Sequence, residues 1–119
     1  MSQNKIKKLL CETGLPVELD LYTGKSDKYI TFTYASERPG EFADNMVITK
    51  IVNLQIQLVT PKDFNYLDLK NKIWDLLEQA DFTVTTVRSF LGDVIMGTEK
   101  IRQTVFDVSY AETRKMEDK

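Results

Sequence analysis

The sequence predicts a single α+β domain, in which an antiparallel or mixed β-sheet is packed on one face by a central helix and a short N-terminal helix. Three observations indicate this class. The 119 residues are enough for one domain and not for two. Several segments alternate between apolar and polar residues, as half-buried strands do, and two others carry apolar residues at helical spacing. These segments follow one another without an internal repeat.

The first predicted element is a short amphipathic helix over about residues 3–13. Its apolar residues recur at helical spacing, and its lysines fall on the other side. Gly14 and Pro16 end the segment, as a glycine followed by a proline commonly does. A helix this short is not stable alone in water, so we expect it to pack against the rest of the domain.

Strand patterns follow in the first half of the chain. Residues 17–22 alternate only ambiguously, whereas residues 29–34 predict a strand because they are aromatic and β-branched throughout. Residues 36–41 contain a Pro-Gly pair, which predicts a loop. The strongest strand pattern covers residues 46–59, and a change of its alternation near Lys50 predicts a bulge or bend there.

A central helix is predicted over about residues 65–80, with Trp74 as its largest apolar side chain. Asp63 and Asn65 are both suitable N-caps, because a short polar side chain can accept a hydrogen bond from the first free backbone amides. Two further strands and a charged, frayed tail are predicted over residues 82–87, 101–110 and 111–119.

The composition excludes most familiar catalysis. The chain has no histidine and one cysteine, so it cannot form a Ser-His-Asp or Cys-His couple or a histidine-based zinc site. Glu18 and Asp20 would share one strand face, and we expect that face to be solvated rather than to bind a metal. We therefore expect no enzyme activity, no cofactor and no metal.

Charge and hydropathy bear on the compartment. The formal net charge is −2, which does not suit a protein whose main task is to grip nucleic acid. No apolar run approaches the roughly 20 residues of a membrane-spanning helix. The single Cys11 cannot form an intramolecular disulfide. We expect a cytoplasmic protein that does not enter membranes.

Residues 89–98 form a predicted loop that is unusually apolar. Such a segment either folds back over the core or is an exposed patch that binds a partner, and the sequence leaves both alternatives open. On a domain without catalytic groups, the second alternative favours assembly over chemistry. The apolar side chains are Phe90, Leu91, Val94, Ile95 and Met96.

The order of these elements resembles that of the tail-terminator, or tail-completion, proteins of long-tailed bacteriophages and prophages. The resemblance is carried by the early strand at residues 29–34, by a strand–helix–strand unit and by a final strand. The strand–helix–strand unit comprises residues 52–59, 67–77 and 82–84, and the final strand comprises residues 102–110.

The resemblance implies a virion structural protein that caps the tail tube and helps to join the tail to the head. Members of the family typically assemble as hexameric rings, bind tail-tube and head-connector proteins, and let DNA pass through the ring without reading its sequence. The implied locations are the virion and, during assembly, the host cytoplasm. The family offers no catalytic residues. The alternative is a small intracellular protein- or peptide-binding module.

On this resemblance, subunit contacts are formed by loops and sheet edges, which points to residues 37–45 and 90–96. A ring contact joins two different patches of each subunit, so both segments can serve at once. The candidate interface residues are Glu37, Arg38, Glu41 and Phe42 in the first segment and Phe90, Leu91, Val94, Ile95 and Met96 in the second.

Overall fold

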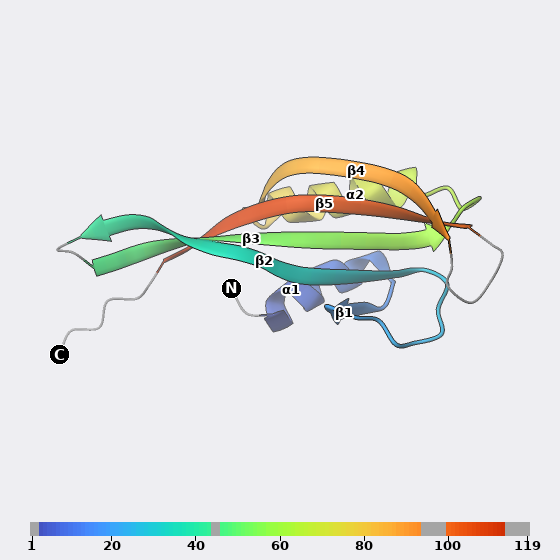
Figure 1. The fold of residues 1–119 in the computed structure, drawn as a ribbon, viewed down its shortest axis with the longest axis horizontal. Helices are drawn as coiled ribbons and strands as arrows, with labels where there is room; N and C mark the ends of the chain where they lie inside the picture. Colours follow the sequence, from blue (N-terminus) through green and yellow to red (C-terminus); the bar gives the residue numbers. More distant parts are fainter. Residues whose placement is uncertain (1–2, 44–45, 94–99, 114–119) are drawn as a thin grey trace.

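The computed structural model describes residues 3–43, 46–93 and 100–113 (Figure 1). The elements follow the predicted order of helix, strands, helix and strands. They are α1 (Gln3–Leu10), a short 3₁₀ turn η1 (Cys11–Thr13), β1 (Val17–Leu19), β2 (Tyr29–Ala43), β3 (Met46–Pro61), α2 (Leu67–Gln79), β4 (Thr83–Asp93) and β5 (Lys100–Thr113).

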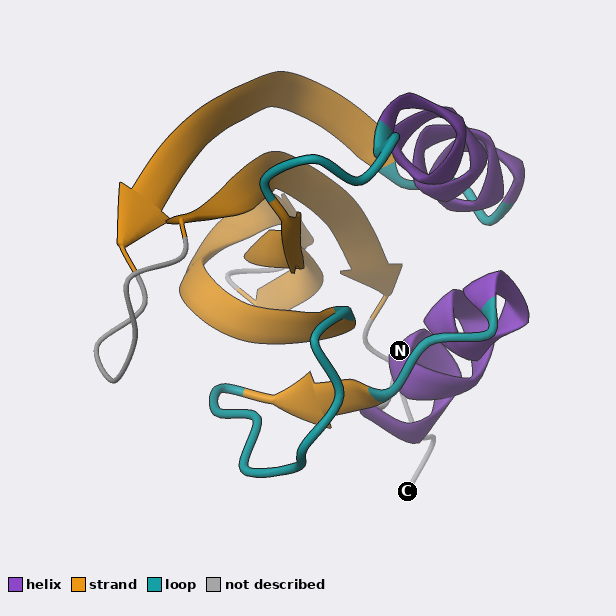
Figure 2. Cartoon of the chain, turned by 90° about the vertical axis from the view of Figure 1, so that its right-hand side faces the viewer, coloured by secondary structure: helices purple, strands orange, loops and turns teal. Residues whose placement is uncertain are grey.

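The strands form one five-stranded sheet in the order β1-β2-β3-β5-β4. β1 runs parallel to β2, and the other three pairs are antiparallel, so the sheet is mixed. Both helices lie on the same side of the sheet (Figure 2). The predicted α+β class, with a central helix and a short N-terminal helix on a mixed sheet, is confirmed.

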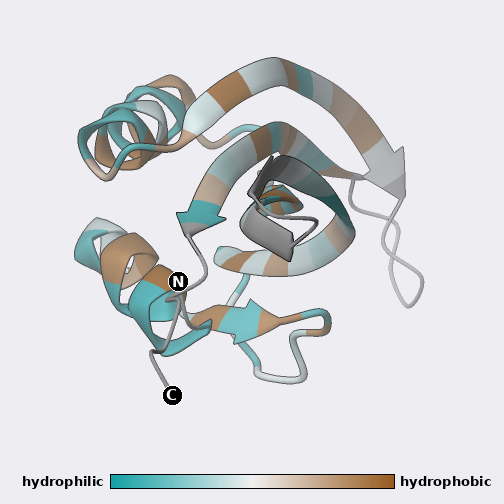
Figure 3. Cartoon of the chain, turned by 90° about the vertical axis from the view of Figure 1, so that its left-hand side faces the viewer, coloured by the Kyte–Doolittle hydropathy of each residue, from teal (hydrophilic) through white to brown (hydrophobic). Residues whose placement is uncertain are grey.

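The hydrophobic core fills the space between the sheet and the two helices. One cross-strand row runs from Phe32 through Ile56 and Phe106 to Val87, and its first three side chains are fully buried. Bands of opposite hydropathy alternate along the strands (Figure 3), as expected when only one face of a sheet meets the core. The helices contribute four fully buried side chains, namely Ile6, Leu10, Ile73 and Leu77.

The β2–β3 hairpin continues well beyond the helices as a narrow extension (Figure 1). We call this extension, residues 36–43 and 46–53, the arm. It accounts for the elongated outline, which measures 58 × 25 × 22 Å. The predicted loop over residues 36–41 is therefore wrong. The Pro-Gly pair lies inside β2, where Gly40 is an extra, unpaired residue of a bulge and Pro39 is tolerated because the strand is at an edge there.

The register supports the predicted irregularity near Lys50. The pairing of β2 with β3 shifts on both sides of Glu41, with Gly40 as the extra residue of β2 and Ile48 as the extra residue of β3. In contrast, β3 pairs with β5 without interruption from Thr49 to Pro61. The irregularity thus involves both strands of the arm and leaves the pairing of β3 with β5 regular.

Two boundaries in the second half correct the sequence predictions. β4 continues to Asp93, so the predicted loop over residues 89–98 is wrong in its first part, and residues 94–99 lie outside the described residues. β5 continues to Thr113 because it pairs with the arm, so fraying from residue 111 is wrong for residues 111–113. Residues 114–119 lie outside the described part.

The central helix begins two residues later than predicted, at Leu67, and ends at Gln79. The N-cap position is Tyr66, so the prediction of Asp63 or Asn65 there is wrong. Asn65 lies one residue earlier, and its Oδ1 accepts a hydrogen bond of 3.3 Å from the Leu67 backbone amide. Neither helix of the described chain is long and apolar enough to cross a membrane.

Candidate assembly surfaces

The two segments that carry the described interface candidates, the arm and the end of β4, lie at opposite ends of the molecule (Figure 1). Glu37 and Arg38 are exposed on the arm, and Phe90 and Leu91 are exposed near the end of β4. Glu41 and Phe42 continue the backbone of β2 along the arm. Val94, Ile95 and Met96 lie outside the described residues.

A charged cluster crosses the two strands of the arm and the neighbouring end of β5. The Lys50 Nζ lies 2.9 Å from Glu37 Oε1 and 3.7 Å from Glu112 Oε2. The hydrogen bond from Lys50 to the Glu37 carboxylate raises the pKa of the lysine. All three side chains are partly exposed, so the cluster adds little to stability and mainly fixes the surface charge of the arm.

Two tyrosines lie where the arm meets the core. Tyr110 is buried and Tyr34 is 38% exposed, and their hydroxyls are hydrogen-bonded to each other. Burial, the Tyr34 side chain and the Glu112 and Glu37 carboxylates raise the pKa of Tyr110 to about 12. Burial and the Glu112 carboxylate raise the pKa of Tyr34 as well. The hydrogen bond between the two neutral phenols thus lies at the boundary between the charged arm and the apolar core.

We expect the folded protein to lose stability in strongly alkaline solution through Tyr110. Its folded-state pKa is raised to about 12, so its contribution is complete below the ordinary value of about 10 and disappears as the pH rises through about 12. In an absorbance titration, Tyr110 should form tyrosinate in a late step, at a higher pH than the more exposed tyrosines, and the protein should unfold in the same step. In Tyr110→Phe, the amplitude of the late step should fall by one tyrosine, because Tyr34, whose pKa is also raised, remains. A wild-type titration in which every tyrosine ionises near pH 10 without unfolding would contradict the assignment.

The opposite end presents two apolar side chains on different faces of β4. Phe90 is 45% exposed on the face turned away from the helices, where it pairs with Gln103. Leu91 is 47% exposed on the helix-facing side, where it pairs with Arg102. The sequence left open whether these residues fold onto the core or are exposed, and the structure places both at the surface.

Arg88 and Ser89 are surface residues of β4 that the sequence analysis did not single out. The Arg88 Nη2 lies 3.3 Å from Asp107 Oδ2, and Ser89 Oγ lies 3.0 Å from Thr104 Oγ1 on β5. The predicted strand ends at residue 87 and the predicted loop begins at Ser89, so the sequence pattern does not show these two side chains as parts of one strand. Their alternation becomes visible only once β4 is known to continue to Asp93.

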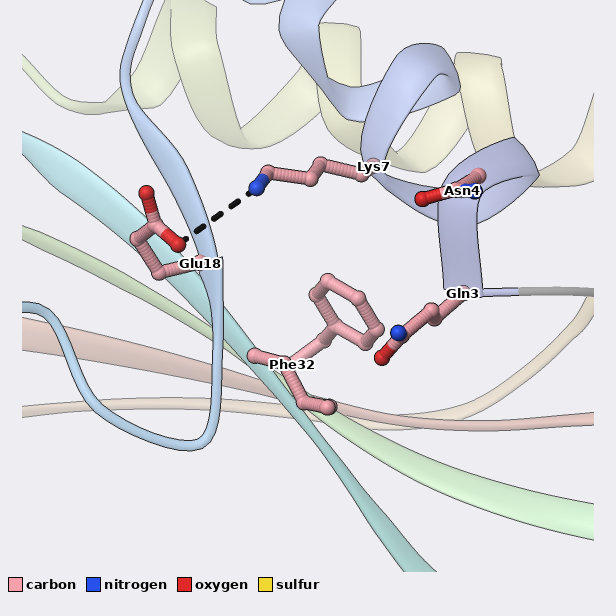
Figure 4. A pocket seen from close by; sticks show the side chains of 6 residues that line it. Gln3, Asn4, Lys7, Glu18 and Phe32 are labelled. Carbon is pink, nitrogen blue, oxygen red and sulfur yellow. Dashed lines mark hydrogen bonds and ion pairs between the residues drawn. The ribbon is translucent and has the colours of Figure 1, made fainter.

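A pocket of about 240 Å³ lies between α1, β1 and β2 (Figure 4). Its rim carries an ion pair of 3.4 Å between Lys7 Nζ and Glu18 Oε2, and Phe32 forms part of its lining. The predicted shared face of Glu18 and Asp20 is wrong, because Asp20 follows β1 with a φ of 66°. No group of three or more potential metal ligands occurs among the residues that the structure describes.

Comparison with known proteins adds the fold and nothing more specific. No protein-family model matches the sequence, and no curated protein matches it either. One solved structure, known only by a serial designation, covers 99% of both chains with a TM-score of 0.50 and 12% sequence identity. Similarity at this identity shows that the whole chain adopts a known fold.

Proposed function

We propose that the chain is a structural subunit of a bacteriophage or prophage virion, which caps the tail tube and helps to join it to the head. The observation that carries the proposal is the position of the two candidate surfaces at opposite ends of an elongated subunit. A closed ring needs a contact between two different patches of neighbouring subunits, and each copy offers the arm and the end of β4.

The chemistry of the two surfaces supports contact between them. The exposed part of the arm is charged at Glu37, Arg38 and Lys50, whereas the end of β4 offers Phe90 and Leu91. Interfaces combine an apolar centre with a polar rim, and the charged arm suits the rim around these two side chains. The family resemblance adds the proposed number of subunits, six, and the tail-tube and head-connector proteins as partners.

The net charge of −2 suits a ring through which DNA passes without recognition of its base sequence. A strongly basic lumen would retain the phosphate backbone, since phosphate contacts dominate the affinity of proteins for DNA. The proposed locations are the virion and, before that, the cytoplasm of the host.

Tube elongation tests the proposal. Purified tail-tube protein from the phage that encodes the chain is allowed to polymerise, and the chain is added in amounts far below the tube subunits. A capping protein stops growth at these amounts because it acts only at tube ends, so the tubes should stay short. Tubes that grow to the same length with and without the chain would overturn the proposal.

A further inference from the structure

β4 is an open edge of the sheet. It is the last strand in the order β1-β2-β3-β5-β4, and its ladder in the described chain is formed with β5 alone. In Figure 1, β4 runs along the upper margin of the molecule. Most of its side chains are exposed, and its free backbone groups can pair with another strand.

The other edge of the sheet is protected, and β4 is not. Beyond the short β1, the outer edge of β2 carries Pro39 and bulges at Ala35 and Gly40, which are features that prevent a further strand from pairing. β4 has one bulge, at Thr85, and then a regular run from Thr86 to Asp93. This run contains no proline and no lysine. Its edge is therefore suited to accept a strand.

We propose that two copies of the chain pair through their β4 edges, antiparallel, about a twofold axis at Ser89. Such an axis is perpendicular to the sheet, so each residue meets a partner residue that projects from the same face. The two five-stranded sheets then continue into one sheet with all helices on one side. This pairing does not depend on the proposed function.

The register about Ser89 makes β4 complementary to itself. On the face away from the helices, Arg88 lies opposite the partner's Phe90, where a guanidinium can stack on the ring. On the helix-facing side, Val87 lies opposite the partner's Leu91, which places two apolar side chains together. Both contacts occur twice. They cover Phe90 and Leu91, the large apolar side chains that the described part of β4 exposes at this end.

Neighbouring registers are less favourable. Centring the pair on Arg88 places two arginines directly opposite each other, which is destabilising. Centring it on Phe90 places the two Phe90 rings opposite each other, but it also places Arg88 opposite Gly92 and Leu91 opposite Ser89. One aromatic pair then replaces two copies each of the Arg88–Phe90 and Val87–Leu91 contacts. A register shifted by one residue would turn one copy over, so that the helices of the two copies would lie on opposite sides of the joined sheet. These comparisons favour the register centred on Ser89.

The pairing has a consequence for ring assembly. It covers Phe90 and Leu91, so copies must separate before these side chains can contact the arm of a neighbouring subunit. The β4 pair is thus a state of the protein before assembly. Because it covers the side chains of the ring contact, it would delay ring formation until a tube end binds the separated copies.

Two substitutions at one position test the register. Light scattering over a wide range of concentration should give the wild type twice the 13.8 kDa mass of one chain at the upper end. In Phe90→Glu, the carboxylate faces the partner's Arg88 and the pair should persist. In Phe90→Arg, two like charges face each other on each side, and the dissociation constant should rise roughly tenfold or more. Melting curves check that both variants fold.

A disulfide provides the second test. Opposed residues of antiparallel strands have Cα atoms about 4.5–5.5 Å apart, within disulfide range. In a Cys11→Ser background, Ser89→Cys should therefore form a covalent dimer on mild oxidation. The control is Thr86→Cys, because in this register the two introduced thiols lie about 20 Å apart. A wild type that is monomeric at every concentration, or equal cross-linking at the two positions, would overturn the pairing. A persisting effect on tube elongation would show that the proposed function survives that result.

Discussion

Replacing Phe106 by alanine will lower the free energy of unfolding by about 3–5 kcal/mol. The side chain is fully buried at the centre of β5, between Ile56 and Val87 in the cross-strand row. Its removal takes apolar surface out of the core and leaves a cavity that the regular central strands cannot close. The melting temperature should fall by on the order of 10–20 °C, which calorimetry or circular dichroism will measure.

The matched control is Phe90→Ala, measured at low concentration where copies are separate. It removes the same atoms from a ring that is 45% exposed on the other face of the sheet, so its cost should stay below about 1 kcal/mol. Equal losses in the two variants would mean that the central row does not form the core.

Reversing one charge of the arm, or placing a charge on the apolar end of β4, should strongly reduce tail capping while the domain stays folded. In Arg38→Glu, the changed residue is exposed on β2, and in Leu91→Asp it is 47% exposed on β4. Neither side chain contributes to the buried core, so melting should change little. Arg38→Glu places a carboxylate where the proposed contact has a guanidinium, and Leu91→Asp places a carboxylate at its apolar centre, where the charge loses its water. Capping should fall roughly tenfold or more in each variant.

Two controls match these variants in kind and exposure. Lys8→Glu reverses an exposed charge on α1, and Leu67→Asp changes a leucine that is 48% exposed at the start of α2. Both should cap tubes like the wild type. Capping that depends on only one of the two ends would contradict a contact between different patches. Capping that is lost equally in the controls would show a general effect of charge.

The sequence predicted the core of the fold because that part follows simple periodicity. The alternating pattern around Ile56 and the helical spacing around Ile73 both reflect one buried face, and both residues are fully buried. Strand lengths were harder to predict. Turn-forming residues such as Gly40 and Gly92 lie within strands here, because bulges and exposed edges accept residues that elsewhere mark turns.

The candidate surfaces were predictable only in part. Glu37 and Leu91 were named from the sequence, and both are exposed. The charged cluster was not predicted, because Lys50 and Glu112 are far apart in the chain and meet only through the register of β3 with β5. No pattern in a single sequence encodes that register.

The most direct measurement is electron microscopy of tail tubes to which the chain has been added. With the wild-type chain, we expect a ring of density at one end of each tube, wide enough to leave the lumen open. Tubes mixed with the Arg38→Glu or Leu91→Asp variant should show no such ring at either end. Bare ends with the wild-type chain, or density spread along the tube walls, would contradict the account.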